Sequence, residues 1–152
     1  MDKDLLDHLK TLHTAAIDAR NGYQEALEDA EGHGLTGLFN EMIALHEGNA
    51  RELAAELSKA GETPDDDGSF MSIIHRTIMN VRSLFNGLDG SVLPGLIDGE
   101  KRNVSKYDDA LQATTAPTSI TALLTTQRSK IQQKIAKMEV EQAEYKNASA
   151  ST

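Results

Sequence analysis

The chain lacks cysteine, long apolar runs and an excess of basic residues, and each absence excludes a class of protein. With no cysteine among 152 residues, thiol catalysis, thiolate metal sites and disulfide frameworks are excluded. No stretch approaches the roughly 20 apolar residues that span a bilayer, and the N-terminus, MDKDLLDHLK, lacks the apolar core of a signal peptide. The sequence therefore predicts a soluble, cytoplasmic protein with no membrane partner.

Acidic residues outnumber basic residues, 24 to 15, so the formal net charge is -9 at pH 7. Such a surface argues against nucleic acid as a partner. A chain of this length is most simply one domain. We expect residues 1–146 to form that domain and the small, polar residues 147–152 to form a flexible tail.

A short repeat divides the chain into two related halves. The pentapeptide YQEAL at 23–27 recurs as YDDAL at 107–111, and both copies lie in segments with helical apolar spacing. Apolar residues in alternating steps of four and three predict four helices, over about 5–30, 35–59, 93–115 and 120–145. Glycines and Pro117 separate these helices, and Thr118 or Ser119 is the expected cap of the last one.

The four helices are expected to pair as two hairpins. Between the hairpins, residues 69–87 carry a fifth apolar stripe, which predicts a short extra helix in the crossover. At about 1.5 Å per residue, that helix is long enough to carry the chain most of the way along a bundle. Hairpin two should then run opposite to hairpin one. The glycine and proline breaks disfavour the alternative, a single long coiled coil.

Several short motifs follow one another at set spacings: Gly22-Tyr23 with Ala26, Ala54 to Leu57, Gly61 with Pro64, Gly68-Ser69, His75-Arg76, Gly99-Glu100 and Tyr107. In order and spacing they resemble an uncharacterised bacterial family of ferritin-like four-helix bundles, a domain of unknown function. The resemblance spans about residues 5–140. It implies an all-α, ferritin-like four-helix bundle and suggests a stress-related setting, but it brings no assigned activity.

The ligand pattern of metal-oxidising ferritin-like bundles is missing. Such sites take a Glu from each of two helices and a Glu-x-x-His pair from each of the other two. The residues three before the histidines are Leu5, Lys10, Ala30, Ile43 and Ser72. None is acidic, and residues 110–138 contain no Asp, Glu or His. Asp18 and Glu25 project opposite the first apolar stripe, so we expect both in solvent. A standard di-iron site is therefore not expected, which favours a protein that is not an enzyme.

Polar residues nevertheless interrupt the apolar stripes. His46, Glu100 and Gln127 fall near the stripe centres, Tyr23 and Tyr107 lie on core stripes, and Arg20 flanks the first one. Buried polar groups need partners. The favoured interpretation is one or two hydrogen-bonded layers that fix the helix register, formed by Arg20, Tyr23, His46, Glu100 and Gln127. On this interpretation the protein is a structural or partner-binding bundle.

The alternative is a mononuclear or incomplete metal site with oxidase or storage activity. His46 and Glu100 would hold a divalent ion such as iron, manganese or zinc. Two protein ligands are too few for a tight site. His75 could add a third only if the crossover helix packs across the bundle at that height. Apolar residues of the same segment, Met71, Ile73 and Leu84, offer a surface for a homo-oligomer or a protein partner.

Overall fold

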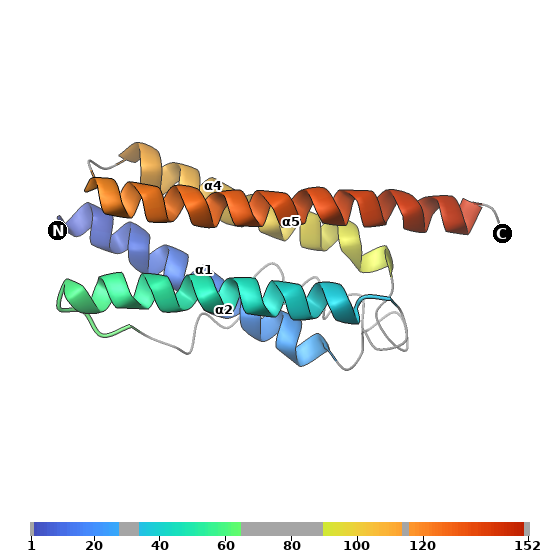
Figure 1. The fold of residues 1–152 in the computed structure, drawn as a ribbon, viewed down its shortest axis with the longest axis horizontal. Helices are drawn as coiled ribbons and strands as arrows, with labels where there is room; N and C mark the ends of the chain where they lie inside the picture. The colour runs from blue at the N-terminus through green and yellow to red at the C-terminus, as the bar shows by residue number, and fades with distance from the viewer. Residues whose placement is uncertain (1, 28–33, 65–89, 114–115, 151–152) are drawn as a thin grey trace.

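The structure, a computed structural model, describes residues 2–27, 34–64, 90–113 and 116–150. Within these ranges the chain forms four long α-helices and one short 3-10 helix, and no strand: α1 (Lys3–Ala26), α2 (Thr36–Lys59), η2 (Gly90–Val92), α4 (Leu93–Ala113) and α5 (Thr118–Ala150). Helices α1 and α2 form one antiparallel hairpin, and α4 and α5 form the other (Figure 1). The predicted all-α four-helix bundle is confirmed.

The second hairpin runs opposite to the first, as predicted. In Figure 1, α1 and α5 run from left to right, whereas α2 and α4 run from right to left. The chain therefore leaves α2 at one end of the bundle and enters η2 at the other. The expected crossover helix over 69–87 lies outside the described residues, and so do His75 and the apolar residues proposed for association.

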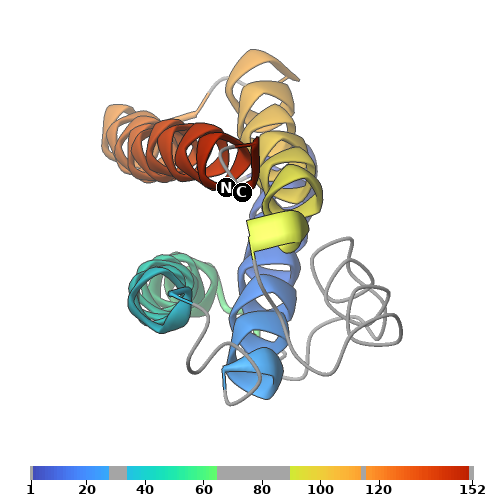
Figure 2. The ribbon, with the colours of Figure 1, turned by 90° about the vertical axis from the view of Figure 1, so that its right-hand side faces the viewer.

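Each long helix buries the stripe that its sequence predicts. Viewed along the bundle, α2 lies beside α1, and α5 lies beside α4 (Figure 2). Helix α1 packs against both α2 and α4, whereas α2 and α5 meet along a looser seam. Full burial of one large apolar side chain contributes roughly 1.5–3 kcal/mol. The stripe residues of α1 and α5 that the structure buries are Leu5, Leu9, Leu12, Ala16, Ala19, Tyr23, Ala26, Ile120, Leu124, Ile131, Ile135 and Met138.

Local hydrogen bonds start and end the helices. Asp2 caps α1, because its Oδ1 accepts a hydrogen bond from the backbone N–H of Leu5 at 2.7 Å. Gly61 follows α2 with φ at 84°, a left-handed conformation that favours glycine. The start of α5 corrects a prediction. Thr118 is already the first helical residue, and the carbonyl of Pro117 accepts the N–H of Thr121, so Pro117 holds the cap position.

The last helix, α5, runs to Ala150. Residues 147–150 of the expected tail are thus helical, while the domain limit at 146 and the flexibility of the tail stay predictions. Near its end, the ring of Tyr145 lies against Gly90 in η2, where an added Cβ would come within 2.3 Å of the ring carbons. Only glycine fits this contact, which holds the end of α5 against the start of α4. None of the described helices is both long and apolar enough to cross a membrane.

Asp18 on α1 corrects another prediction. Its position opposite the apolar stripe predicts a solvated side chain, yet only 6% of the residue is exposed. Because α1 packs against two helices, its buried arc is wider than a single stripe. Asp18 lies on the side that faces α4, where it shares a groove with Lys106. Glu25 is exposed, as predicted.

Candidate functional site

One buried carboxylate gathers polar side chains from three helices. Glu100 on α4 is fully buried. The hydroxyl of Tyr23 on α1 donates to its Oε2 at 3.1 Å, and Nδ2 of Asn103, one turn along α4, donates to its Oε1 at 2.8 Å. Nε2 of His46 on α2 lies 2.7 Å from Oε2 and 3.1 Å from Oε1. We call Tyr23, His46, Glu100 and Asn103 the glutamate layer.

The donors in this layer determine what Glu100 can bind. An ionised carboxylate only accepts hydrogen bonds, so the tautomer of His46 that can donate to an ionised Glu100 is the one with its proton on Nε2. In that tautomer, Nε2 has no lone pair to offer a metal ion. Three donors also offset much of the cost of burying the carboxylate. The glutamate layer is therefore closed on itself.

A second polar group lies beside the first. The hydroxyl of Tyr107 on α4 donates to Oε1 of Gln127 on α5 at 2.7 Å. Nε2 of Gln127 donates in turn to the backbone carbonyl of Asn49 and to Oε1 of Glu52, both on α2 and both at 3.3 Å. Gln127 thus links three helices. We call Asn49, Glu52, Tyr107 and Gln127 the glutamine layer.

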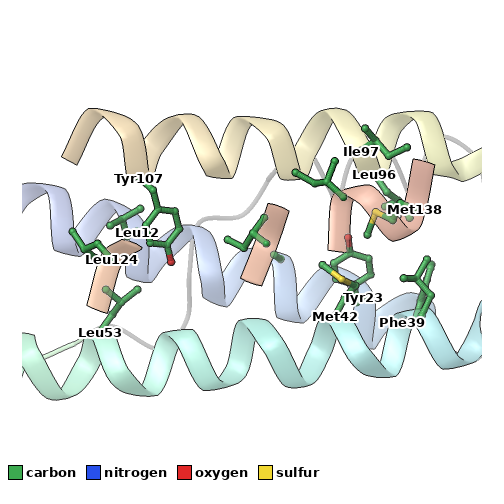
Figure 3. Close-up of a cluster of buried hydrophobic side chains, with 14 of the residues drawn as sticks. Leu12, Tyr23, Phe39, Met42, Leu53, Leu96, Ile97, Tyr107, Leu124 and Met138 are labelled. Atoms are coloured by element: carbon green, nitrogen blue, oxygen red, sulfur yellow. The ribbon is translucent and has the colours of Figure 1, made fainter. Parts of the chain in front are cut away.

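The two tyrosines occupy different levels of the apolar core (Figure 3). The ring of Tyr23 meets the Phe39 ring edge-on at 5.2 Å and stacks on the His46 ring at 6.1 Å. Burial raises the pKa of Tyr23 well above the ordinary 10.0, and the charge and hydrogen bond of Glu100 raise it further. Burial, followed by the charges of Glu100 and Glu52, also raises the pKa of Tyr107. Both hydroxyls therefore remain protonated donors at neutral pH.

These raised tyrosine pKa values predict a loss of stability in alkali. Above about pH 10 the unfolded chain releases tyrosine protons that the folded chain retains, so each buried tyrosine lowers the free energy of unfolding by about 1.4 kcal/mol per pH unit. Below about pH 10 both states are protonated and the contribution is constant. We expect the Tyr107→Phe variant to show a shallower slope than the parent in urea unfolding at a series of alkaline pH values.

The difference in slope between the parent and the Tyr107→Phe variant isolates the contribution of Tyr107. The pKa of Lys137 is also raised, first by its hydrogen bond to Glu41, and Lys137 titrates in the same alkaline range. That contribution is common to the parent and the variant and cancels in the difference. Equal slopes for the two proteins would contradict the assignment.

The structure brings together most of the residues predicted for the polar layers. Tyr23, His46 and Glu100 meet in the glutamate layer, and Gln127 lies in the glutamine layer. Arg20 joins neither, because its guanidinium donates to Oδ1 of the neighbouring Asn21 at 2.9 and 3.2 Å. The donors to Glu100 come instead from Tyr23, His46 and Asn103, which are closer to the bundle axis than a half-buried flanking arginine.

Sequence reasoning missed two buried asparagines. Asn103 lies three residues after Glu100, a spacing that puts both side chains on one helix face, so this signal was present. Asn49 contributes its backbone carbonyl to Gln127. A backbone contact leaves no trace in the side-chain pattern, so the sequence had no signal for it.

These residues do not fit the two-metal site of ferritin-like bundles. On α2, Ile43 rather than Glu lies three residues before His46. The equivalent positions on α5, 84 residues further along the chain, hold Gln127 and Lys130. With the repeat offset of 107 - 23 = 84 residues, the α1 partner of Glu100 is residue 100 - 84 = 16, an alanine. In the part of the chain that the structure describes, no group of three or more His, Cys, Asp or Glu side chains could hold a metal ion.

The space beside the glutamate layer is also small. A cavity of about 10 Å³ is lined by Ala16, His46, Asn103 and Tyr107 among others. That volume is enough for about one water molecule. A small organic substrate does not fit there.

Comparisons with known proteins agree with this fold. A solved structure of bacterioferritin from Rhodobacter capsulatus, described as having a metal-free dinuclear site and heme iron, matches with a TM-score of 0.76 at 14% sequence identity. The match covers 97% of this chain and 88% of that one, and at such identity it shows the fold alone. No curated protein matches the sequence. The family model described as a domain of unknown function, DUF2383, matches residues 4–113, and the chain therefore belongs to that family, with a ferritin-like four-helix-bundle fold.

Proposed function

We propose that this protein is a non-enzymatic ferritin-like bundle with a structural or partner-binding role. The observation that carries the proposal is that Glu100 accepts hydrogen bonds from Tyr23 and Asn103 and lies 2.7 Å from Nε2 of His46. In metal-binding bundles the inward carboxylates ligate cations. Here side-chain protons take the place of the cations and link α1, α2 and α4 through one carboxylate. The bundle accordingly needs no metal ion to hold its helices in register.

The competing function is a degenerate metal-binding protein in which His46 and Glu100 ligate a divalent ion. Such an ion would have to displace the proton on Nε2 of His46 and break the hydrogen bonds from Tyr23 and Asn103. It would gain only two protein ligands, fewer than the three or four typical of zinc sites. The closed glutamate layer therefore favours the structural role. Our proposal places that role in the bacterial cytoplasm, in a stress-related setting, as the likeness to ferritin-like proteins suggests.

Elemental analysis separates the two functions. In protein purified without a metal-affinity tag, we expect iron, manganese and zinc to be well below one equivalent per chain, both in the parent and in Glu100→Gln. Added metal ions should leave the unfolding temperature unchanged, because only a ligand of the folded state raises it. A full equivalent of metal that is lost in Glu100→Gln would establish the metal-binding function instead. Light scattering on the same preparation should reveal an oligomer or a bound protein, and a lone monomer would contradict a partner-binding role.

A further inference from the structure

A groove lies between α4 and α5, the two helices of the second hairpin. It has a volume of about 290 Å³. Its lining consists of Lys101 and Val104 from α4 and Gln132, Ile135, Ala136 and Glu139 from α5. Apolar side chains from both helices therefore lie beside one positive and one negative charge. We call this the α4–α5 groove.

The face of α5 next to this groove is unusually apolar for a face in contact with solvent. Val140, 59% exposed, is the most exposed large apolar side chain among the described residues, and it lies one turn after Ala136 on the same face. Ser129, Gln133 and Ala143 continue this exposed face in steps of three and four, and none of them is charged. The other three long helices show a clear contrast between an apolar and a polar face, whereas α5 shows little. Such a face is typical of a surface that packs against another protein surface.

The two charged residues of the α4–α5 groove make no ion pair with the part of the chain that the structure describes. On the other flank of α5, Lys134 and Lys137 both pair with Glu41 of α2. Lys101 and Glu139 have no such partners among the described residues. In a contact between two copies related by a two-fold axis, each residue meets its counterpart twice. One lysine and one glutamate beside the same apolar groove are therefore complementary to a second copy of themselves.

Heights along the bundle determine where the two-fold axis would pass. Tyr107 hydrogen-bonds to Gln127 across the antiparallel hairpin. Measured from that contact at about 1.5 Å per residue, Lys101 and Glu139 lie roughly 9 Å apart along the bundle. An axis midway between them passes close to Ala136, whose small side chain allows two helices to approach closely. Around this axis the two copies of α5 run antiparallel over about 40 Å.

We propose that the α4–α5 groove is the interface of a symmetric dimer of this chain. Val140 of each copy packs into the groove of the other, and Lys101 of each copy pairs with Glu139 of the other. The charge complementarity of the groove identifies the partner as a second copy. This inference rests on the proposed partner-binding role and specifies both the partner and the surface.

Reversing single charges tests the symmetric contact, with light scattering of the full chain over a series of concentrations. We expect the parent to be a dimer. Lys101→Glu alone and Glu139→Lys alone each place like charges against one another at both contacts, so each should weaken dimerisation at least about tenfold, which corresponds to about 1.4 kcal/mol. An equal mixture of the two variants should dimerise again, because each then carries the charge that the other lacks. The control reversals Lys3→Glu and Asp7→Lys, at exposed positions of α1 away from the groove, should dimerise as the parent does.

A blocking variant tests the location of the interface. Ala136 is exposed and arginine is a good helix former, so Ala136→Arg should keep the helix content of the parent in circular dichroism and yet be a monomer. The proposal is overturned if the parent is a monomer, if Ala136→Arg still dimerises, or if the mixed charge variants do not. A dimer that survives Ala136→Arg would retain the partner-binding role but place the contact elsewhere. A different protein that binds the parent and is lost in Ala136→Arg would overturn the choice of a second copy as partner.

Discussion

Replacing Glu100 by alanine is expected to lower the free energy of unfolding by about 3–5 kcal/mol, a large part of the stability of a domain this size. The change leaves a cavity in the core, and it leaves the side chains of Tyr23, His46 and Asn103 without their hydrogen-bond partner. Glu100→Gln keeps the volume and one acceptor oxygen, so it should cost less, about 1–3 kcal/mol. Denaturant unfolding followed by circular dichroism measures both values.

A matched control for Glu100 is available on the same helix. Asp98→Ala removes an exposed carboxylate two residues away and should change stability by less than about 0.5 kcal/mol. A double replacement, His46→Leu with Glu100→Met, removes both partners of the closest contact. Its cost should be clearly smaller than the sum of the single changes, because apolar pairs can substitute for buried ion pairs. If Glu100→Ala is no less stable than Asp98→Ala, Glu100 does not hold the helices together.

The second large effect is expected at Gln127. Replacing it by alanine removes the acceptor of the buried Tyr107 hydroxyl and the links from α5 to Asn49 and Glu52 on α2. We expect a loss of about 2–4 kcal/mol in the free energy of unfolding, from the cavity and the stranded hydroxyl together. The same denaturant experiment reports it.

Removing both partners should recover much of this loss. In Gln127→Leu/Tyr107→Phe no buried hydroxyl is stranded and the volume is nearly kept, so the double variant should be more stable than Gln127→Ala. Thr125→Ala, an exposed change on the same helix, serves as the control. A Gln127→Ala protein as stable as Thr125→Ala would show that the glutamine layer contributes little to the fold.

The helices were predictable because apolar spacing directly reflects burial on one face. The stripe from Leu5 to Tyr23 and the stripe from Ile120 to Met138 both face the core as predicted. The direction of the second hairpin followed from the expected crossover. Asp18 was misjudged because a single-stripe description takes no account of burial on the flanks of α1. Spacing along one helix says nothing about which other helices will cover its sides.

The sequence predicted which polar residues are buried better than it predicted which of them form hydrogen bonds with one another. Polar residues on apolar stripes, such as His46 and Glu100, stand out because burying them without partners is costly. Arg20 was assigned to the layer because a cation near a lone carboxylate is a plausible partner, yet Asn103 fills that role at 2.8 Å. Which donor reaches a buried carboxylate depends on helix rotation and on distances of a few ångströms between helices. The apolar spacing along a single helix contains no information about helix rotation or about distances between helices.

The contact between Gly90 and Tyr145 has a consequence for how related sequences can vary. An added Cβ at Gly90 would lie 2.3 Å from the Tyr145 ring, so the two positions cannot both carry bulky side chains. A relative with a larger residue in place of Gly90 should therefore carry a smaller one in place of Tyr145, and the two substitutions should be inherited together. Such paired exchange across family members would record the packing of α5 on η2 in the sequences themselves.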